Sequence, residues 1–346
     1  MSPIIGITMG DPAGIGPEII AKAFARQPAG GKRRWLVIGD AGVMRSATRI
    51  AGIAMEIRSI QRVEEARFEA GFLDVFDLKN VKLEQLAMGH VSAMAGNAAF
   101  EAIRSAIELA KSGQIDATVT APINKEALHL AGHKQFPGHT EIFAHFTGTS
   151  DYTMMLAEAD LRVVHVSTHV SLREACERVT RERVLKVIRL ASAACRQLGI
   201  QRPRVGVAGL NPHAGDGGLF GNEEREQIIP AVEAARNEGI AVEGPLPADT
   251  FFAKSMGGAF DICVAMYHDQ GHIPVKIKGF RYDSATGMWQ SVSGINVTLG
   301  LPIIRTSVDH GTAFDQAGKG TASEISLVSA IDYATRLAIH RRGAVK

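Results

Sequence analysis

The sequence predicts an α/β protein with a largely parallel sheet. From one end of the chain to the other, short apolar runs alternate with longer segments in which apolar residues recur every three or four positions. Such alternation is typical of parallel strands joined by crossover helices. The length of 346 residues is long for one domain and sufficient for two that share an interface.

The individual elements follow from the local pattern in chain order. Apolar runs predict eight strands, at 4–9, 35–39, 72–77, 116–120, 153–157, 162–168, 204–210 and 261–267. Apolar residues at helical spacing predict helices at 97–112, 181–198, 223–238 and 322–342. Pro17 suits the first turn of another helix, and residues 137–141 open a helical run that continues to about Gly148. Residues 281–294 are rich in small polar residues and predict a loop or hairpin, in which Trp289 requires a packing partner.

Composition narrows the class of protein. A hydrophobic fraction of 46% and a charged fraction of 21% are those of an ordinary globular chain, and the net charge of +2 gives no reason to expect nucleic acid or an acidic membrane as a partner. The three cysteines are far apart, which indicates reduced thiols in the cytoplasm. The chain has no basic leader followed by a cleavage site and no apolar run of about 18 residues, so we expect neither secretion nor a membrane span.

Three of the predicted strands lead into a histidine. His169, His213 and His268 each follow one of them, and Asp269 comes next to the last. Because ligands of open α/β sheets bind at the carboxyl ends of strands, these side chains are candidates for a ligand site. Neutral imidazoles bind zinc, cobalt or manganese, and three protein ligands leave coordination positions open for a substrate. The other reading is three separate polar strand ends, and the residues alone leave both open.

Several glycine-rich turns add weaker signals. The turn at 211–218 would let backbone approach a bound ligand, and Thr140 at a helix start would favour an anion such as phosphate. The loop at 10–18 joins the first strand to the first helix without the G-x-G-x-x-G fingerprint of dinucleotide-binding folds. Arg305, which precedes the glycine-flanked stretch 306–320, suits the capture of a carboxylate or phosphate.

These blocks together resemble the 4-hydroxythreonine-4-phosphate dehydrogenases of vitamin B6 biosynthesis and their relatives. The resemblance covers nearly the whole chain, and its motifs are M-G-D-P-A-G-I-G-P-E at 9–18, T-A-P-I-N-K-E at 120–126, P-G-H-T-E at 137–141, L-N-P-H-A-G-D-G-G at 210–218, G-P-L-P-A-D-T at 244–250, M-Y-H-D-Q-G at 266–271, N-V-T-L-G-L-P at 296–302, R-T-S-V-D-H-G-T-A at 305–313 and A-G-K-G at 317–320. The wider superfamily is that of the isocitrate and isopropylmalate dehydrogenases. The resemblance implies their two-domain fold, with the active-site cleft between the domains, and a homodimer that shares the active site between subunits.

The resemblance also assigns ranges and residues. It implies one domain from 1–128 plus 296–346, on the NAD side, and another from 129–295 for metal binding, substrate binding and dimerisation. Metal would be held by His169 and His213 of one subunit and His268 of the other, with zinc favoured and magnesium, manganese or cobalt possible. Substrate contacts would come from His139, Thr140, Lys276, Asn296 and Arg305, and the NAD would lie near His310, Gly311, Thr312 and Ala313. Asp269 is the candidate general base. The implied reaction is oxidation of a hydroxy acid followed by loss of CO2.

The branch of the family decides the substrate. V-H-V-S-T-H at 164–169 and H-D-Q-G-H-I-P at 268–274 look more like enzymes that act on D-threonate or D-erythronate 4-phosphate than like the biosynthetic enzymes. The chain departs from the usual pattern at 281–293, which is longer by about ten residues and lies between Lys276 and Asn296. The alternatives are 4-hydroxythreonine 4-phosphate, a dihydrodiol carboxylate, a phosphate acyltransferase that would use neither NAD nor three histidines, and a binding protein without activity.

Overall fold

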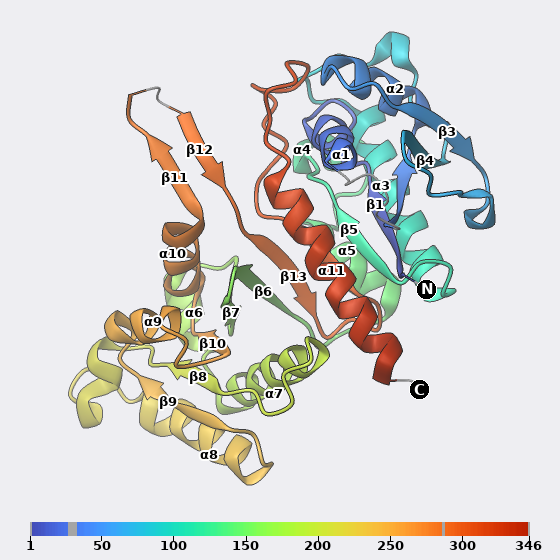
Figure 1. Cartoon of the computed structure of the whole chain (residues 1–346). Helices are drawn as coiled ribbons and strands as arrows, with labels where there is room; N and C mark the ends of the chain where they lie inside the picture. Colours follow the sequence, from blue (N-terminus) through green and yellow to red (C-terminus); the bar gives the residue numbers. More distant parts are fainter. Residues whose placement is uncertain (1, 27–32, 286–287, 345–346) are drawn as a thin grey trace. The chain divides into compact units, whose positions relative to one another are not determined.

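The computed structural model of the protein describes residues 2–26, 33–285 and 288–344 (Figure 1). The chain divides into two compact units: unit 1 comprises Met1–Ser150 with Leu301–Lys346, and unit 2 comprises Asp151–Gly300. Both boundaries differ from the ranges that the resemblance implies. A helix at His139–Thr147 packs on a helix at Ala93–Lys111 and keeps residues 129–150 in unit 1. The strand Ile295–Leu299 belongs to unit 2 because it pairs with the strand Thr153–Glu158.

Unit 1 is built on a six-stranded parallel sheet. Its strand order is β3-β4-β2-β1-β5-β14, and all five neighbouring pairs are parallel. The strands are β1 (Ile4–Thr8), β2 (Arg34–Gly39), β3 (Glu56–Ile60), β4 (Phe72–Asp77), β5 (Ala117–Thr120) and β14 (Arg305–Val308). All five residues of β1 are buried, as expected of a strand with helices on both faces. β14 joins this sheet from the far end of the chain, which explains why both chain ends belong to unit 1.

The helices of unit 1 form two groups that cover the sheet. One group packs α1 (Gly16–Ala25) against α2 (Ala41–Ile50) and α11 (Ile325–Ala344), and the other packs α3 (Ala93–Lys111) against α4 (Lys125–Leu130) and α5 (His139–Thr147). The start of α3 is defined by Ser92, whose hydroxyl accepts a hydrogen bond from the Ala95 N–H at 3.2 Å. Gly96 lets α4 approach closely, since a Cβ there would lie 2.0 Å from the Ala127 carbonyl oxygen.

Unit 2 has a six-stranded mixed sheet in the order β13-β6-β7-β10-β8-β9. Its strands are β6 (Thr153–Glu158), β7 (Leu161–His165), β8 (Val205–Ala208), β9 (Val242–Leu246), β10 (Ile262–Ala265) and β13 (Ile295–Leu299). β7, β10, β8 and β9 are parallel, whereas β6 runs antiparallel to both of its neighbours. The predicted α/β class is therefore confirmed, and the sheet is mixed rather than parallel throughout.

Helices and one hairpin complete unit 2. α7 (Arg181–Gln197) packs on α8 (Ile229–Asn237), while α9 (Ala248–Met256) and α10 (His268–Gly279) contact strands of the sheet, and α6 (Leu172–Arg178) follows β7. β11 (Phe280–Asp283) and β12 (Met288–Val292) form an antiparallel pair directly after α10, so the hairpin expected at 281–294 is confirmed (Figure 1). The side chain of Trp289, for which the sequence requires a packing partner, lies outside the described residues.

The eight predicted strands and four predicted helices are all present, and α1 and α5 start as predicted. Four strands that the sequence does not predict are β3, β9, β13 and β14. β3 buries only one of its five residues and so forms no apolar run. β14 is buried but polar, and tertiary hydrogen bonds such as Thr306 Oγ1 to the Ala330 carbonyl at 2.9 Å satisfy its side chains. Among the described residues, no helix is both long and apolar enough to cross a membrane.

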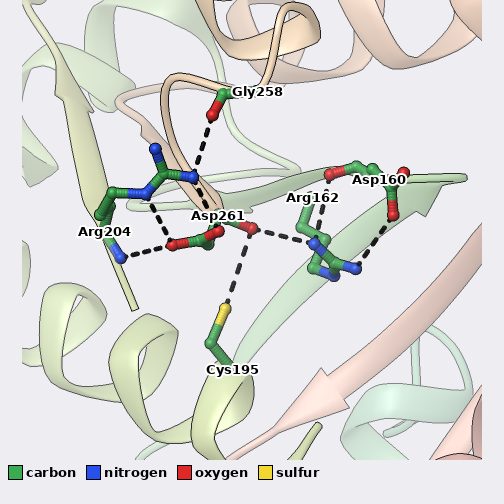
Figure 2. Close-up of polar contacts among 6 residues, drawn as sticks. All are labelled: Asp160, Arg162, Cys195, Arg204, Gly258 and Asp261. Atoms are coloured by element: carbon green, nitrogen blue, oxygen red, sulfur yellow. Dashed lines mark hydrogen bonds and ion pairs between the residues drawn. The ribbon is translucent and has the colours of Figure 1, made fainter. Parts of the chain in front are cut away.

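The amino-terminal edge of the unit 2 sheet is closed by an ion-paired network centred on Asp261, the residue before β10 (Figure 2). The Asp261 carboxylate accepts hydrogen bonds from the Arg204 backbone N–H at 2.7 Å and from the Arg204 guanidinium at 3.1 Å. Its carbonyl oxygen accepts from Arg162 at 3.1 Å. Burial would raise the pKa of Asp261, but these contacts with Arg204 outweigh it and lower that pKa. These contacts join neighbouring strands at their amino-terminal ends. Ligands of open α/β sheets bind at the opposite end, where the strands have their carboxyl ends.

Candidate active site

The carboxyl edge of the unit 2 sheet brings two of the predicted metal ligands together. β10 lies between β7 and β8 and is parallel to both, so the residues that follow these three strands emerge at the same edge. The rings of His169 and His268 have their centroids 5.8 Å apart. Both side chains line a cavity of about 450 Å³, together with Thr168, Ser171, Leu172, Tyr267 and Asp269. A cavity of this size accepts a small organic acid.

Asp269 sets the orientation of His268. The Nδ1 atom of His268 lies 2.6 Å from Asp269 Oδ1. An ionised carboxylate only accepts hydrogen bonds, so Nδ1 carries the proton and Nε2 presents its lone pair. This is the arrangement in which a carboxylate orients a metal-binding histidine. The sequence analysis proposes Asp269 as a general base, but its carboxylate is engaged with His268.

His213 stands on a strained turn. In the 3-10 segment Pro212–Gly218, five consecutive residues, His213 to Gly217, have φ between 43° and 81°. Three of them are not glycines, and left-handed backbone costs such residues about 1–2 kcal/mol each. Runs of this kind persist only where the surroundings hold them, and they concentrate at functional sites. The ring of His213 has its centroid 6.3 Å from that of Phe220.

Glu224 holds the base of this turn. It is 1% exposed and belongs to a π-helical turn at Glu224–Ile228 that precedes α8. Its Oε1 accepts from the N–H groups of Leu210 and Asn211, both at 2.7 Å, and its Oε2 accepts from Asn211 Nδ2 at 2.9 Å. Gly215 makes room for it, since a Cβ there would lie 2.7 Å from Oε2. The buried carboxylate therefore fixes the chain between β8 and His213.

Two further histidines lie behind His268. The His272 ring stacks on the His268 ring, with centroids 3.6 Å apart and planes 13° apart. The His165 ring lies 4.7 Å from that of His272. Burial, with His268 as the next cause, lowers the pKa of His272 to about 4, and burial, followed by His272, lowers that of His165 to about 3. Both rings are therefore neutral near pH 7.

The donor set fits a divalent metal ion. Imidazoles at a strand edge, one of them oriented by a carboxylate, are ligands that zinc, cobalt and manganese bind. Across residues 2–26, 33–285 and 288–344 of a single chain, no three His, Cys, Asp or Glu side chains come close enough to hold such an ion. The triad of His169, His213 and His268 therefore stays a prediction, in which the resemblance assigns one ligand to a second subunit.

The predicted substrate residues of unit 2 lie on α10 and β13. Lys276 is one helical turn beyond His272, with its Nζ 4.5 Å from the centroid of the Phe280 ring. Asn296 is the second residue of β13 and pairs with Leu156 in β6. Its Oδ1 is buried and has no hydrogen-bond partner among the described residues. A buried acceptor of this kind usually meets a ligand or water.

Unit 1 brings Arg305 and His139 together. Arg305 of β14 is 3% exposed, its guanidinium donates to Thr120 Oγ1 at 2.8 Å, and burial lowers its pKa to about 9. His139 begins α5, and burial, then the positive charge of Arg305, lowers its pKa well below the usual value. The His139 Nε2 atom is buried and has no hydrogen-bond partner within the described chain. With Thr140 in the first turn of α5, where backbone N–H groups are available, the group suits an anion.

The loop that carries His310, Gly311, Thr312 and Ala313 is tied to the first helix. The Ile15 N–H donates to the Thr312 carbonyl at 3.1 Å, and a Cβ at Gly14 would lie 3.1 Å from Thr312. Glu18, fully buried in α1, accepts from the Gly318 and Gly320 N–H groups at 2.6 and 2.7 Å. Motifs 300 residues apart in the sequence therefore lie side by side.

Four residues of these sites escape the sequence analysis. Glu18 and Glu224 are buried carboxylates that hold loops; Glu18 ends the motif at 9–18, but the pattern of residues gives neither side chain a role. His272 follows His268 at a spacing of four residues, which on a helix places both on one face and could have signalled the pair. His165 reads as a strand residue, and its approach to His272 depends on tertiary packing.

The chain is similar to known proteins over nearly its whole length. The family model of the pyridoxal phosphate biosynthetic protein PdxA matches residues 32–334. The chain is 51% identical to a D-threonate 4-phosphate dehydrogenase of Cupriavidus necator over 98% of each chain. It is 52% identical to a 4-hydroxythreonine-4-phosphate dehydrogenase of Beijerinckia indica, over 97% of this chain and 95% of the relative.

A solved structure agrees with the fold. The crystal structure of a 4-hydroxythreonine-4-phosphate dehydrogenase from Klebsiella pneumoniae matches with a TM-score of 0.86 and 46% identity, over 98% of each chain. The similarity extends over 98% of the chain and therefore over both units.

Proposed function

The chain belongs to the family of the pyridoxal phosphate biosynthetic protein PdxA, and on this premise we propose that it oxidises D-threonate 4-phosphate, or its close relative D-erythronate 4-phosphate, with NAD and a divalent metal ion. It is a dehydrogenase that acts on a CH–OH group. The observation that carries the proposal further is the His268 ring, which Asp269 orients at the cavity on the carboxyl edge.

The proposed reaction balances as follows. A hydride passes from C3 of the substrate to NAD, which becomes NADH, and the hydroxyl proton passes to a base. The resulting 3-keto acid loses CO2, and the enolate that remains takes up a proton. A metal ion held by His169, His213 and His268, with the last from a second subunit, would polarise the hydroxyl and carboxylate oxygens of the substrate. Asp269 would keep the His268 Nε2 lone pair available for that ion rather than act as the base.

Binding of the phosphorylated acid rests on the chain's own cations. Arg305 is buried and planar, and it can hold two oxygens of a phosphate or carboxylate at once. His139 and Thr140 at the start of α5 would add hydrogen bonds to the same group, and Lys276 and Asn296 of unit 2 would meet another part of the substrate. The 310–313 loop, tied to α1, would lie near the NAD.

The second candidate is 4-hydroxythreonine 4-phosphate. It is supported by the Beijerinckia indica relative at 52% identity, which carries that name. We favour D-threonate 4-phosphate because of His165 and His272, which lie in the two stretches that resemble that branch and which pack together behind the candidate metal ligand.

The test is formation of NADH by purified protein loaded with zinc, manganese or cobalt. D-Threonate, D-erythronate and 4-hydroxythreonine 4-phosphates would be compared with and without a chelator. We expect chelator-sensitive NADH formation and CO2 release with D-threonate or D-erythronate 4-phosphate. Turnover that survives complete removal of metal would refute the metal assignment, and preference for 4-hydroxythreonine 4-phosphate would refute the substrate.

A variant separates the metal site from the fold. His213→Ala should abolish turnover while the circular dichroism spectrum and melting temperature stay those of the parent. Ile273→Ala, at a position 55% exposed on α10, provides the matched control and should retain activity. Full activity of the His213→Ala protein would remove this residue from the site.

A further inference from the structure

Behind the candidate metal ligand His268, the structure carries two histidines to which no role is assigned. We propose that His272, backed by His165, is a positioning residue that holds the His268 ring in its ligand-binding orientation before metal arrives. This inference rests on the proposed function, because it requires that His268 binds a metal ion.

His268 and His272 are in direct contact. They stand one turn apart on α10, and their rings lie face to face, with centroids 3.6 Å apart and planes 13° apart. A ring in this arrangement cannot turn about its Cβ–Cγ bond without losing the stack. The tautomer of His268 is set separately by Asp269 at 2.6 Å. His272 therefore constrains the orientation of the His268 ring, and Asp269 constrains its tautomer.

The His272 side chain is held by a hydrogen bond to the backbone of His268. The ring is 7% exposed, and its Nδ1 lies 2.9 Å from the carbonyl oxygen of His268. A carbonyl only accepts, so His272 donates from Nδ1 and its side chain is tied to the backbone of the residue on which it stacks. Leucine or phenylalanine would fill this space but could not make that hydrogen bond.

His165 is the last residue of β7. Its ring is fully buried, 4.7 Å from the ring of His272, and its Nδ1 lies 3.4 Å from the Met154 carbonyl oxygen. Gly271 allows this approach, because a Cβ there would lie 2.3 Å from His165 Nε2. That Nε2 atom has no hydrogen-bond partner within the described chain. A buried unpaired acceptor lowers stability, so an aliphatic residue would serve a purely structural role better.

The consequence is a preorganised ligand. A ring already held in one orientation loses less conformational freedom when it binds an ion, so its affinity for that ion is higher. Residues that support metal ligands from behind change metal affinity by about 10–100-fold when they are replaced. We expect a weakening of that order for His272→Leu.

The experiment measures metal binding directly. Metal-free protein would be titrated with zinc or cobalt against a competing chromophoric chelator, for the parent and for His272→Leu, His272→Phe and Ile273→Ala. The leucine variant should bind about tenfold or more weakly, and the phenylalanine variant, which keeps a flat ring, should fall between it and the parent. Ile273→Ala should match the parent. Melting temperatures of the metal-free proteins show whether each variant is folded.

The outcomes separate the two hypotheses. If the parent binds no metal, the proposed function fails, and this inference fails with it. If the parent binds metal and folded His272→Leu binds it equally well, the positioning role alone is overturned.

A measurement on the parent protein covers the case in which the variants do not fold. Nitrogen-15 NMR of the imidazole rings should show the proton of both His268 and His272 on Nδ1 in the metal-free protein. A proton on Nε2 of either ring would overturn the assignment.

Discussion

Replacement of Asp11 by asparagine should make unit 1 more stable above pH 6 and leave it unchanged near pH 4. Asp11 follows β1 and is fully buried. Its Oδ1 accepts from the Ala13 N–H at 2.8 Å, whereas its Oδ2 has no hydrogen-bond partner in the described part of the chain. Burial raises its pKa from 3.8 to about 6, against the opposing effect of the backbone N–H groups of Ala13 and Asn124.

The magnitude follows from proton linkage. Below pH 3.8 the carboxyl group holds its proton in both the folded and the unfolded chain, and it makes no difference to stability. Between pH 3.8 and 6 only the folded chain keeps the proton, so the free energy of unfolding falls as pH rises. A gap of about two pKa units, at about 1.4 kcal/mol each, amounts to about 3 kcal/mol above pH 6. Asparagine resembles the protonated acid and escapes this loss.

The assay is urea unfolding of both proteins from pH 4 to pH 8. The chain has two tryptophans, and in a Trp289→Phe background the fluorescence of Trp35, buried in β2 at 3% exposure, reports on unit 1 alone. Asp332→Asn, on α11, removes one charge at a side chain that is 53% exposed and serves as the control. An Asp11→Asn advantage that does not grow between pH 4 and pH 7 would refute the reasoning.

Three further substitutions test other parts of the structure. Gly96→Ala should destabilise unit 1 by about 3 kcal/mol or more, because its Cβ would overlap the Ala127 carbonyl. Ser105→Ala, at a half-buried position of the same helix α3, is the control, and an equal melting temperature of the two variants would contradict this. Glu224→Gln should lower the stability of unit 2 by about 1–3 kcal/mol in urea unfolding, since its amide would face Asn211 Nδ2. Unchanged unfolding would show that the turn does not need the negative charge of Glu224. Arg305→Lys should raise KM for the phosphorylated substrate by about 10–100-fold with little change in zinc affinity; an unchanged KM would remove Arg305 from the substrate site.

The local pattern determines most of the fold. Apolar strands such as β1, β7 and β10 are recognisable because they are buried on both faces, and helices such as α7 because one face is apolar. β14 is not predicted because two of its polar residues, Arg305 and Thr306, find their hydrogen-bond partners far away in the chain. The antiparallel direction of β6 is also not predicted from the sequence, because the direction of pairing depends on how strands are connected rather than on their composition.

The candidate site divides in the same way. The sequence by itself predicts the histidines that follow strands as ligand candidates, because ligands of open α/β sheets bind at the carboxyl ends of strands. Only the tertiary structure shows the contacts of each histidine. His268 contacts Asp269 and His272, and the turn that carries His213 is held by the hydrogen bonds of Glu224. The spacing of four residues places His268 and His272 on one helix face, but ring orientation, buried hydrogen bonds and left-handed backbone depend on the packing around them, which the order of residues does not display.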